Sequence, residues 1–254
     1  MLIKFLGTGT SHGVPVVGCS CKTCTSNNPK NKRMRSSIFI KVNNLNILID
    51  TSTELRLQML NNNIDNVDLV LFTHAHADHI MGFDDIRVIN WLNDKTVPCY
   101  GNKKTITHIK NAFNYIFNPP QIGGGIPQVK LNIIQDNFLF ENLKIEPLKV
   151  KHGKLEILGY KIKNIAYITD CSFIPEETME KIKNIDLLIL DALRFEKHPT
   201  HMNLEEALET VKEINPKKTY FTHISHELEH VEVNNILPSN VKLAFDGMQL
   251  KINK

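Results

Sequence analysis

The feature that most constrains this chain is a cluster of metal-ligand side chains directly after a short apolar stretch. His74, His76, Asp78 and His79 lie within residues 73–79, which follow the apolar residues 67–72. Three histidines and an aspartate this close together cannot all lie on one face of a helix or strand, so we expect a loop that brings them onto cations. A polar turn is the alternative, but such turns favour glycine, asparagine, serine or proline. The sequence therefore predicts a buried strand that delivers a metal-binding loop.

Length and composition predict a single globular domain over residues 1–254, because 254 residues with 42% hydrophobic and 22% charged residues can bury a full core. The formal net charge is +3, and the lysines are spread along the chain. This distribution argues against a basic tail for nucleic acid, and it is compatible with a small anionic substrate. We expect no stable nucleic-acid complex, and a homodimer remains compatible with the sequence.

The apolar N-terminal residues 1–6 stop at Gly7, which is too short for a signal-peptide core, and no apolar run reaches the length of a membrane span. These features predict a cytoplasmic protein without membrane contact. The chain has five cysteines, and three of them form a C-x-C-x-x-C cluster. This arrangement favours a metal site plus two buried thiols, Cys99 and Cys171, over a set of disulfides.

Alternation of apolar runs and helical periodicity predicts a mixed α/β chain. Asn43 and Asn44 are expected to form a hairpin turn, Asn203 to cap a helix, and the aromatic Trp91 to pack in the core or line a cleft. Strands are expected over residues 2–6, 36–42, 46–50, 67–72, 97–100, 130–134, 138–140, 144–150, 155–162, 165–169, 186–190 and 218–222, and helices over 50–62, 84–92, 103–117, 175–183 and 204–214. Residues 118–127 break all periodicity and predict a loop.

The glycines of residues 7–13 narrowly miss the dinucleotide-binding pattern G-x-G-x-x-G. No helical pattern follows them, so no helix N-terminus is available for a pyrophosphate, and we exclude a Rossmann site. We expect these glycines to let the backbone approach the metal site closely.

The H-x-H-x-D-H pattern of residues 74–79 resembles the signature of the metallo-β-lactamase superfamily. The opening residues 6–15 and the cysteine cluster of residues 18–24 resemble the PhnP-like cyclic-phosphate phosphodiesterase branch, which is associated with phosphonate breakdown, and the resemblance covers almost the whole chain. It implies an α/β fold, an αββα sandwich with a two-metal hydrolytic site at one edge.

The resemblance also implies a set of site residues. It places His74, His76, His152 and Asp170 on one metal, and Asp78, His79, His223 and the bridging Asp170 on the other. Asp78 and His201 are the implied catalytic residues, since residues 198–201 resemble the H-P-T-H element whose second histidine acts near the leaving group. Two divalent ions, zinc, manganese or iron, would hold a hydroxide between them. Asp50 is either a brace for a metal-binding histidine or a helix cap.

A separate structural zinc site is expected at Cys19, Cys21 and Cys24. A closed tetrahedral zinc site needs four ligands, and only three are present locally. The resemblance supplies His226 as the fourth. The alternative is that these cysteines are merely buried.

The leading hypothesis is a dinuclear metal-dependent phosphodiesterase that hydrolyses a small phosphodiester, such as a cyclic ribose or nucleotide phosphate, by attack of the metal-bridged hydroxide. A tRNA 3′-processing endonuclease shares the ligand set, but it predicts a long basic arm, and the sequence contains no such insert. A non-catalytic relative of the quinone-cofactor biosynthesis type shares the cysteine cluster, and the intact metal-ligand motif speaks against it.

Overall fold

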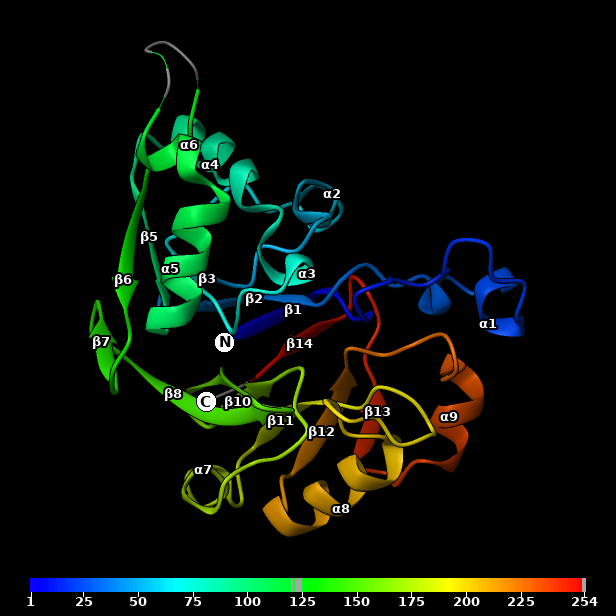
Figure 1. The fold of residues 1–254 in the computed structure, drawn as a ribbon. Coiled ribbons are helices and arrows are strands. Elements are labelled where there is room, and N and C mark those ends of the chain that lie inside the picture. Colours follow the sequence, from blue (N-terminus) through cyan, green and yellow to red (C-terminus); the bar gives the residue numbers. More distant parts are fainter. Residues whose placement is uncertain (120, 122–124, 253–254) are drawn as a thin grey trace. The chain divides into compact units, whose positions relative to one another are not determined.

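The computed structural model describes residues 1–119, 121 and 125–252, and the chain forms two compact units (Figure 1). Unit 1 consists of residues 1–6, 37–135 and 247–254, and unit 2 consists of residues 7–36 and 136–246. Each unit holds one seven-stranded sheet with its own helices. The N-terminal segment 7–36 therefore belongs to the unit built mainly from the C-terminal half of the chain.

The sheet of unit 1 has the strand order β14-β1-β2-β3-β4-β5-β6, in which β3 to β6 are parallel. Its strands are β1 (Leu2–Gly7), β2 (Ser37–Val42), β3 (Leu45–Ile49), β4 (Leu69–Leu71), β5 (Val97–Gly101), β6 (Val129–Ile133) and β14 (Gln249–Lys251). Its helices are α2 (Leu55–Asn61), α3 (Ala77–Ile80), η2 (Phe83–Asp85), α4 (Ile86–Asn93), α5 (Lys103–Ala112) and α6 (Asn114–Phe117).

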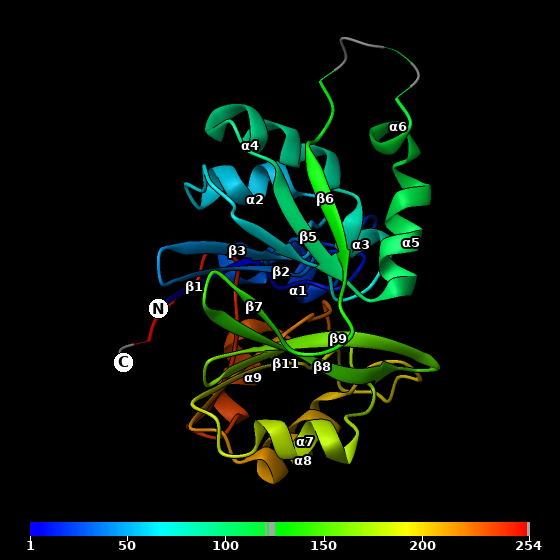
Figure 2. The same ribbon diagram turned by 90° about the vertical axis from the view of Figure 1, so that its left-hand side faces the viewer.

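The helices of unit 1 pack on one face of its sheet, as Figure 2 shows. Leu48 and Val70 face apolar side chains of all five α-helices of this unit in one buried cluster. Ile47 and Leu71, on the opposite face of the same strands, are also fully buried. The central strands are therefore apolar on both faces, which explains why their sequences are continuous apolar runs.

The sheet of unit 2 has the order β13-β12-β11-β10-β9-β8-β7, in which β10 to β13 are parallel and β7 to β10 antiparallel. Its strands are β7 (Phe138–Phe140), β8 (Leu143–His152), β9 (Leu155–Ile162), β10 (Ile165–Ile168), β11 (Leu187–Asp191), β12 (Lys218–Thr222) and β13 (Val241–Leu243). Its helices are α1 (Lys22–Thr25), η1 (Pro29–Asn31), α7 (Glu176–Ile182), α8 (Leu204–Ile214) and α9 (His230–Ile236), and α7 to α9 share one apolar core with the sheet.

Local sequence signals explain several element boundaries. Asn43 and Asn44 both have positive φ, 49° and 65°, as a two-residue hairpin turn requires. Asn203 caps α8 by accepting from the backbone N–H of Glu206, whose carboxylate accepts in return from the N–H of Asn203. Asn215 ends that helix in the left-handed conformation, with φ 53°. Across the described residues, no helix has both the length and the apolarity that crossing a membrane needs.

The prediction of a mixed α/β chain is confirmed, while some local predictions are wrong. The expected helix over 50–62 begins only at Leu55, and the helix over 103–117 breaks at Phe113 into α5 and α6. Trp91 is 81% exposed on the outer face of α4, so it does not pack in the core, but it lines a pocket with Val88 and Gln128, which agrees with the alternative of a cleft wall. Residues 120 and 122–124 of the predicted loop 118–127 lie outside the described residues.

The glycines of residues 7–13 are expected to let the backbone approach the metal site, and Gly9 forms a β-bridge with Ile224, directly after the candidate ligand His223. A Cβ atom at Gly9 would lie 2.9 Å from the carbonyl oxygen of Arg33, and the N–H of Gly9 donates to the carbonyl of Met34 at 2.8 Å. The close approach at this position is thus to a neighbouring backbone segment of unit 2.

Candidate metal-binding sites

Most candidate site residues lie where a strand ends. In unit 1, Asp50 follows β3 and His74 follows β4, which are parallel neighbours. In unit 2, Asp170, Asp191 and His223 stand at the carboxyl ends of the parallel strands β10, β11 and β12. Since the carboxyl ends of parallel strands meet at one edge, each sheet gathers its polar residues there.

The histidine cluster of unit 1 is part loop and part helix. His74 lies in the loop, its ring centroid 4.5 Å from that of His76 and 4.2 Å from that of His79. His76 precedes α3, whose residues Asp78 and His79 are buried with 3.3 Å between an aspartate oxygen and the histidine Nε2. The purely loop-like conformation expected from the sequence is therefore wrong for residues 77–80, although the four side chains do converge.

Asp50 fixes the position of two residues in this segment, Thr73 and His79. Its carboxylate accepts from Nδ1 of His79 at 2.8 Å, and from the backbone N–H and hydroxyl of Thr73, both at 2.8 Å. Burial raises the pKa of Asp50, and the neighbouring His79 opposes that rise. Because α2 begins five residues later, Asp50 does not cap a helix, and its contacts are those of a brace for an imidazole.

His152 ends β8 in unit 2, and its ring orientation is fixed by Thr200. Nδ1 of His152 donates to the carbonyl oxygen of Thr200 at 2.7 Å, so Nε2 carries the lone pair. The next residue, Gly153, has φ +58°, and a Cβ atom there would lie 2.8 Å from the side chain of Thr200. Glycine is needed at this position both for the turn and for the approach of Thr200.

Asp170 and His223 adopt an unusual backbone conformation at the ends of β10 and β12. Their φ angles are 54° and 55°, and Asp50 in unit 1 has φ 63°. Asp170 and His223 are both buried, with 3.2 Å between a carboxylate oxygen of Asp170 and Nε2 of His223. Left-handed conformations at residues other than glycine are costly and cluster at functional sites, so they mark these strand ends as candidates for function.

Asp191 is a site residue that the sequence analysis missed. Its carboxylate accepts from Nδ1 of His201 at 2.9 Å and from the backbone N–H of Cys171 at 2.9 Å. The ring of His201 stacks on that of His223, with 4.8 Å between centroids and 10° between planes, and lies 4.6 Å from the ring of His152. A carboxylate directly after an apolar strand was the available signal, as it was for Asp50.

Unit 2 also brings the cysteine cluster and His226 together. The ligand atoms of Cys19, Cys21, Cys24 and His226 all lie within 4.8 Å of one another, and Nδ1 of His226 is 3.4 Å and 3.2 Å from the sulfurs of Cys19 and Cys21. The hydrogen bond from the backbone of Cys24 lowers the pKa of Cys21 to about 6, whereas burial raises that of Cys24 to about 11. We refer to these four residues as the clamp.

A buried arginine fastens the segment that carries His226. Arg33 is 2% exposed, and its guanidinium donates to the carbonyls of Ser225 and Leu228 at 2.8 Å and 2.7 Å. Burial lowers the pKa of Arg33 to about 10. The clamp and Arg33 thus join the N-terminal segment 7–36 to the backbone beyond β12.

The donor chemistry fits divalent metals. In His79 and His152, Nδ1 donates to a carboxylate or carbonyl oxygen, which leaves Nε2 as the nitrogen with the lone pair. Imidazoles oriented in this way, together with carboxylates, suit zinc, manganese or iron, and three sulfurs with one imidazole suit zinc. The remaining expected thiols, Cys99 and Cys171, are fully buried outside the clamp, as predicted.

Comparison with known proteins agrees with this architecture. Residues 45–224 match the family described as a beta-lactamase superfamily domain. A crystal structure described as a new diphosphatase from the PhnP family has a TM-score of 0.93 and 39% sequence identity, and the match covers 99% of this chain and 98% of that one. The chain therefore belongs to the metallo-β-lactamase superfamily. Within that superfamily it belongs to the PhnP family.

Other similar proteins differ in identity and in how much of their length this chain matches. Zinc-bound PqqB from Methylobacterium extorquens has a TM-score of 0.78 at 19% identity, over 99% of this chain and all of that one, which shows the fold alone. An octanoyltransferase of Porphyromonas gingivalis is 38% identical over 98% of this chain but 51% of its own length. A ribonuclease Z of Clostridioides difficile is 25% identical over 68% of this chain and 59% of its own length. The chain thus spans about half to three-fifths of these two curated relatives.

Proposed function

We propose that this protein is a dinuclear metal-dependent phosphodiesterase that acts on a small phosphodiester with a sugar alkoxide leaving group. The proposed ligands are those that the family resemblance implies: His74, His76, His152 and Asp170 for one ion, and Asp78, His79, His223 and Asp170 for the other. Three observations support them: the fixed ring orientation of His79, that of His152, and the contact between Asp170 and His223.

The observation that carries the proposal is the position of His201. Asp191 holds its Nδ1, and its ring lies against His223 and His152, so that Nε2 is presented among proposed metal ligands. Both proposed metal shells are complete without it. An imidazole that a carboxylate orients in this way is suited to act as a general acid, which donates a proton to the leaving oxygen.

The proposed chemistry divides between the metals and His201. Two divalent ions held by these residues would supply Lewis-acid chemistry that activates water and neutralises charge at phosphorus. His201, protonated on both ring nitrogens, passes the proton of Nε2 to the alkoxide oxygen as the P–O bond breaks and regains a proton from solvent, while Asp191 keeps the ring in the required orientation. Water adds across the bond, so the products are a phosphomonoester and an alcohol. Asp78 is a catalytic residue through its proposed contact with the metal.

The clamp completes the proposed cofactor set. We propose that Cys19, Cys21, Cys24 and His226 bind one structural zinc ion, because three sulfurs and one imidazole make a closed tetrahedral set. Reduced cysteines at this site are compatible with the proposed cytoplasmic location. The single domain over residues 1–254 and a homodimer remain part of this proposal.

Hydrolysis of a diphosphate is a second candidate, favoured by the name of the structural neighbour with 39% identity. A phosphate leaving group needs less protonation than an alkoxide, so the support of His201 by Asp191 favours the diester. We do not assign acyl transfer to this chain on the basis of the Porphyromonas gingivalis relative, since Cys99 and Cys171 are fully buried and the other three thiols form the clamp.

The test is a parallel assay of the purified, metal-reconstituted protein on 2′,3′-cyclic nucleotides, bis(p-nitrophenyl) phosphate, a nucleoside diphosphate, a phosphomonoester, a β-lactam and pre-tRNA. We expect the highest kcat/KM on a diester. A preference for the diphosphate would replace the proposed reaction with the second candidate, and cleavage of pre-tRNA alone would replace it with tRNA processing.

A further inference from the structure

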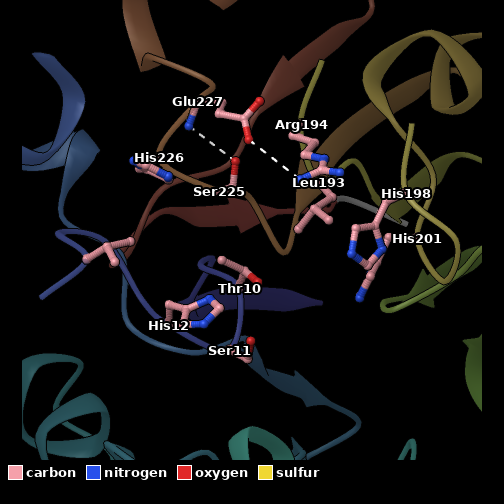
Figure 3. Close-up of a pocket in the computed structure, with 11 residues that line it drawn as sticks. Thr10, Ser11, His12, Leu193, Arg194, His198, His201, Ser225, His226 and Glu227 are labelled. Atoms are coloured by element: carbon pink, nitrogen blue, oxygen red, sulfur yellow. Dashed lines mark hydrogen bonds and ion pairs between the residues drawn. The ribbon is translucent and has the colours of Figure 1, made fainter. Parts of the chain in front are cut away.

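A pocket of about 310 Å³ opens beside His201 within unit 2 (Figure 3). Its walls come from the loops after β11 and β12, which carry Arg194 and Glu227, and from residues 10–12 of the N-terminal segment. This volume lies at the lower end of the range for ligand pockets, so it suits one sugar or nucleoside. Ligands commonly bind outside the carboxyl ends of parallel strands, where these two loops lie.

Arg194 is held in place by backbone atoms. Its Nε and Nη2 donate to the carbonyls of Glu196 and Lys197 at 3.2 Å and 3.0 Å. Nη1 lies 4.0 Å from a carboxylate oxygen of Glu227, which is too long for a direct hydrogen bond. Both side chains are about one-third exposed, at 32% and 36%. A fixed donor, Arg194, and a carboxylate acceptor, Glu227, therefore face each other across a gap that one oxygen atom can bridge.

The pocket carries balanced charge. Arg194 and Glu227 are its only permanently charged side chains among the described lining residues. Burial, together with the charges of His201 and Arg194, lowers the pKa of His198, which disfavours the charged form of that ring. A dianionic phosphate would gain from Arg194 but would be repelled by Glu227. A hydroxyl group can donate to Glu227 and accept from Arg194 at once, so it satisfies both.

We propose that this pocket binds the uncharged, hydroxyl-bearing sugar or nucleoside that carries the leaving oxygen, with one hydroxyl bridging Arg194 and Glu227. This inference rests on the proposed phosphodiesterase function and specifies its substrate. His201 lines the same pocket, so a sugar bound there places its ester oxygen next to the proposed acid. His226 also lines the pocket, which makes one ligand of the clamp part of the pocket wall.

The first experiment compares two substitutions in the metal-loaded enzyme, Glu227→Gln and Arg194→Gln, with adenosine 2′,3′-cyclic phosphate as substrate. If a hydroxyl bridges the pair, each substitution removes a charge-assisted hydrogen bond and raises KM, by about tenfold. If the pocket instead takes a second phosphate, the signs differ: Arg194→Gln raises KM for a 5′-phosphorylated cyclic nucleotide, and Glu227→Gln lowers it. Opposite signs would overturn the inference.

The matched control is Glu196→Gln, which makes the same charge change on an exposed side chain of the same loop that does not line the pocket. It should leave KM unchanged. Equal KM values for Glu227→Gln and Glu196→Gln would also overturn the inference.

A second measurement separates the pocket from the reaction. Adenosine binding to the metal-loaded protein, followed by saturation-transfer NMR, should weaken in Glu227→Gln and stay unchanged in Glu196→Gln. If the protein binds adenosine in this way but hydrolyses no phosphodiester, the proposed function fails while the pocket assignment stands. If it hydrolyses diesters but binds adenosine equally well in both variants, the pocket assignment fails while the function stands.

Discussion

The two units contribute their candidate metal ligands in different ways. In unit 1, His74, His76, Asp78 and His79 come from one stretch of six residues. In unit 2, the site residues are separated along the chain from His152 to His223, and the pairing of β8 to β12 brings their strand ends together. The candidate metal ligands of unit 1 can therefore be recognised from one local motif, whereas those of unit 2 come together only when its sheet has formed.

This difference predicts how substitutions in each unit should affect the protein. A substitution in unit 1 should act through one compact cluster and its brace, Asp50. A substitution at a strand end of unit 2 should act through several groups at once, because a single residue there can have several partners. Asp191, for example, contacts both His201 and the backbone of Cys171. The clamp, also in unit 2, should affect stability more than catalysis.

The largest effect is expected for Asp170→Ala. Removing the proposed bridging carboxylate leaves two cations that repel each other without neutralisation, so at least one metal ion and nearly all turnover should be lost. Metal analysis and kcat on a cyclic nucleotide provide the measurement. Because Asp170 has φ 54°, Asp170→Asn is the matched variant that tolerates this backbone conformation. Two catalytic ions retained in Asp170→Ala, with the wild-type rate, would disprove the bridge.

In unit 1, Asp50→Asn should weaken metal binding by about 10- to 100-fold, because the brace orients His79 without touching the metal. Asparagine also tolerates the φ of 63° at this position. Titration of the apoprotein with zinc or manganese measures the change in affinity. An unchanged affinity would show that Asp50 serves only to satisfy the backbone and hydroxyl of Thr73.

The clamp should behave differently from both ligand sets. Cys21→Ser should remove one zinc ion and lower Tm while the catalytic pair can still be loaded. Serine can keep the helix-capping contact that Cys21 makes with the N–H of Cys24, so the loss can be attributed to the metal. Cys99→Ala, which removes a buried thiol outside the clamp, is the control for zinc content. An unchanged zinc count in Cys21→Ser would reject the clamp.

The smallest effect concerns His230, which begins α9 in unit 2. Burial, together with the charges of Lys30 and Arg33, lowers its pKa from 6.5 to about 4. The unfolded chain therefore takes up this proton at a higher pH than the folded protein does, so stability falls as pH falls from about 6.5 to about 4.

Replacing this histidine should remove part of that acid sensitivity. His230→Gln should flatten the fall in the free energy of unfolding across the window, as measured by urea denaturation at several pH values. His108→Gln, at an exposed histidine of α5, is the control and should leave the curve unchanged. A curve for His230→Gln that parallels the wild type would contradict the assignment.

The sequence predicts much of the fold because many signals are local. The turn at Asn43 and Asn44 and the cap at Asn203 depend on neighbours within a few residues, and both are confirmed. For Asp191, the local signal of a carboxylate after an apolar strand marks a candidate but does not reveal its partners. Its contacts with His201 and Cys171 depend on the parallel pairing of β10 and β11, which no local pattern encodes. The pair of Arg194 and Glu227 was missed for the same reason, since the two residues lie on loops after different strands.

His201 is proposed to protonate a sugar alkoxide as it leaves phosphorus. An alkoxide is a poor leaving group, and proton donation by a placed histidine contributes about 10² to 10⁴ in rate. An aryl group departs readily as its anion, so it needs this help far less.

The most direct test is the ratio of kcat/KM losses in His201→Ala on adenosine 2′,3′-cyclic phosphate and on bis(p-nitrophenyl) phosphate. We expect full metal content, a loss of about 10² or more on the cyclic nucleotide, and a much smaller loss on the aryl diester. Equal losses on the two substrates would contradict the role of His201 as a general acid and would assign it to phosphate binding. Loss of a metal ion in His201→Ala would instead identify His201 as a metal ligand.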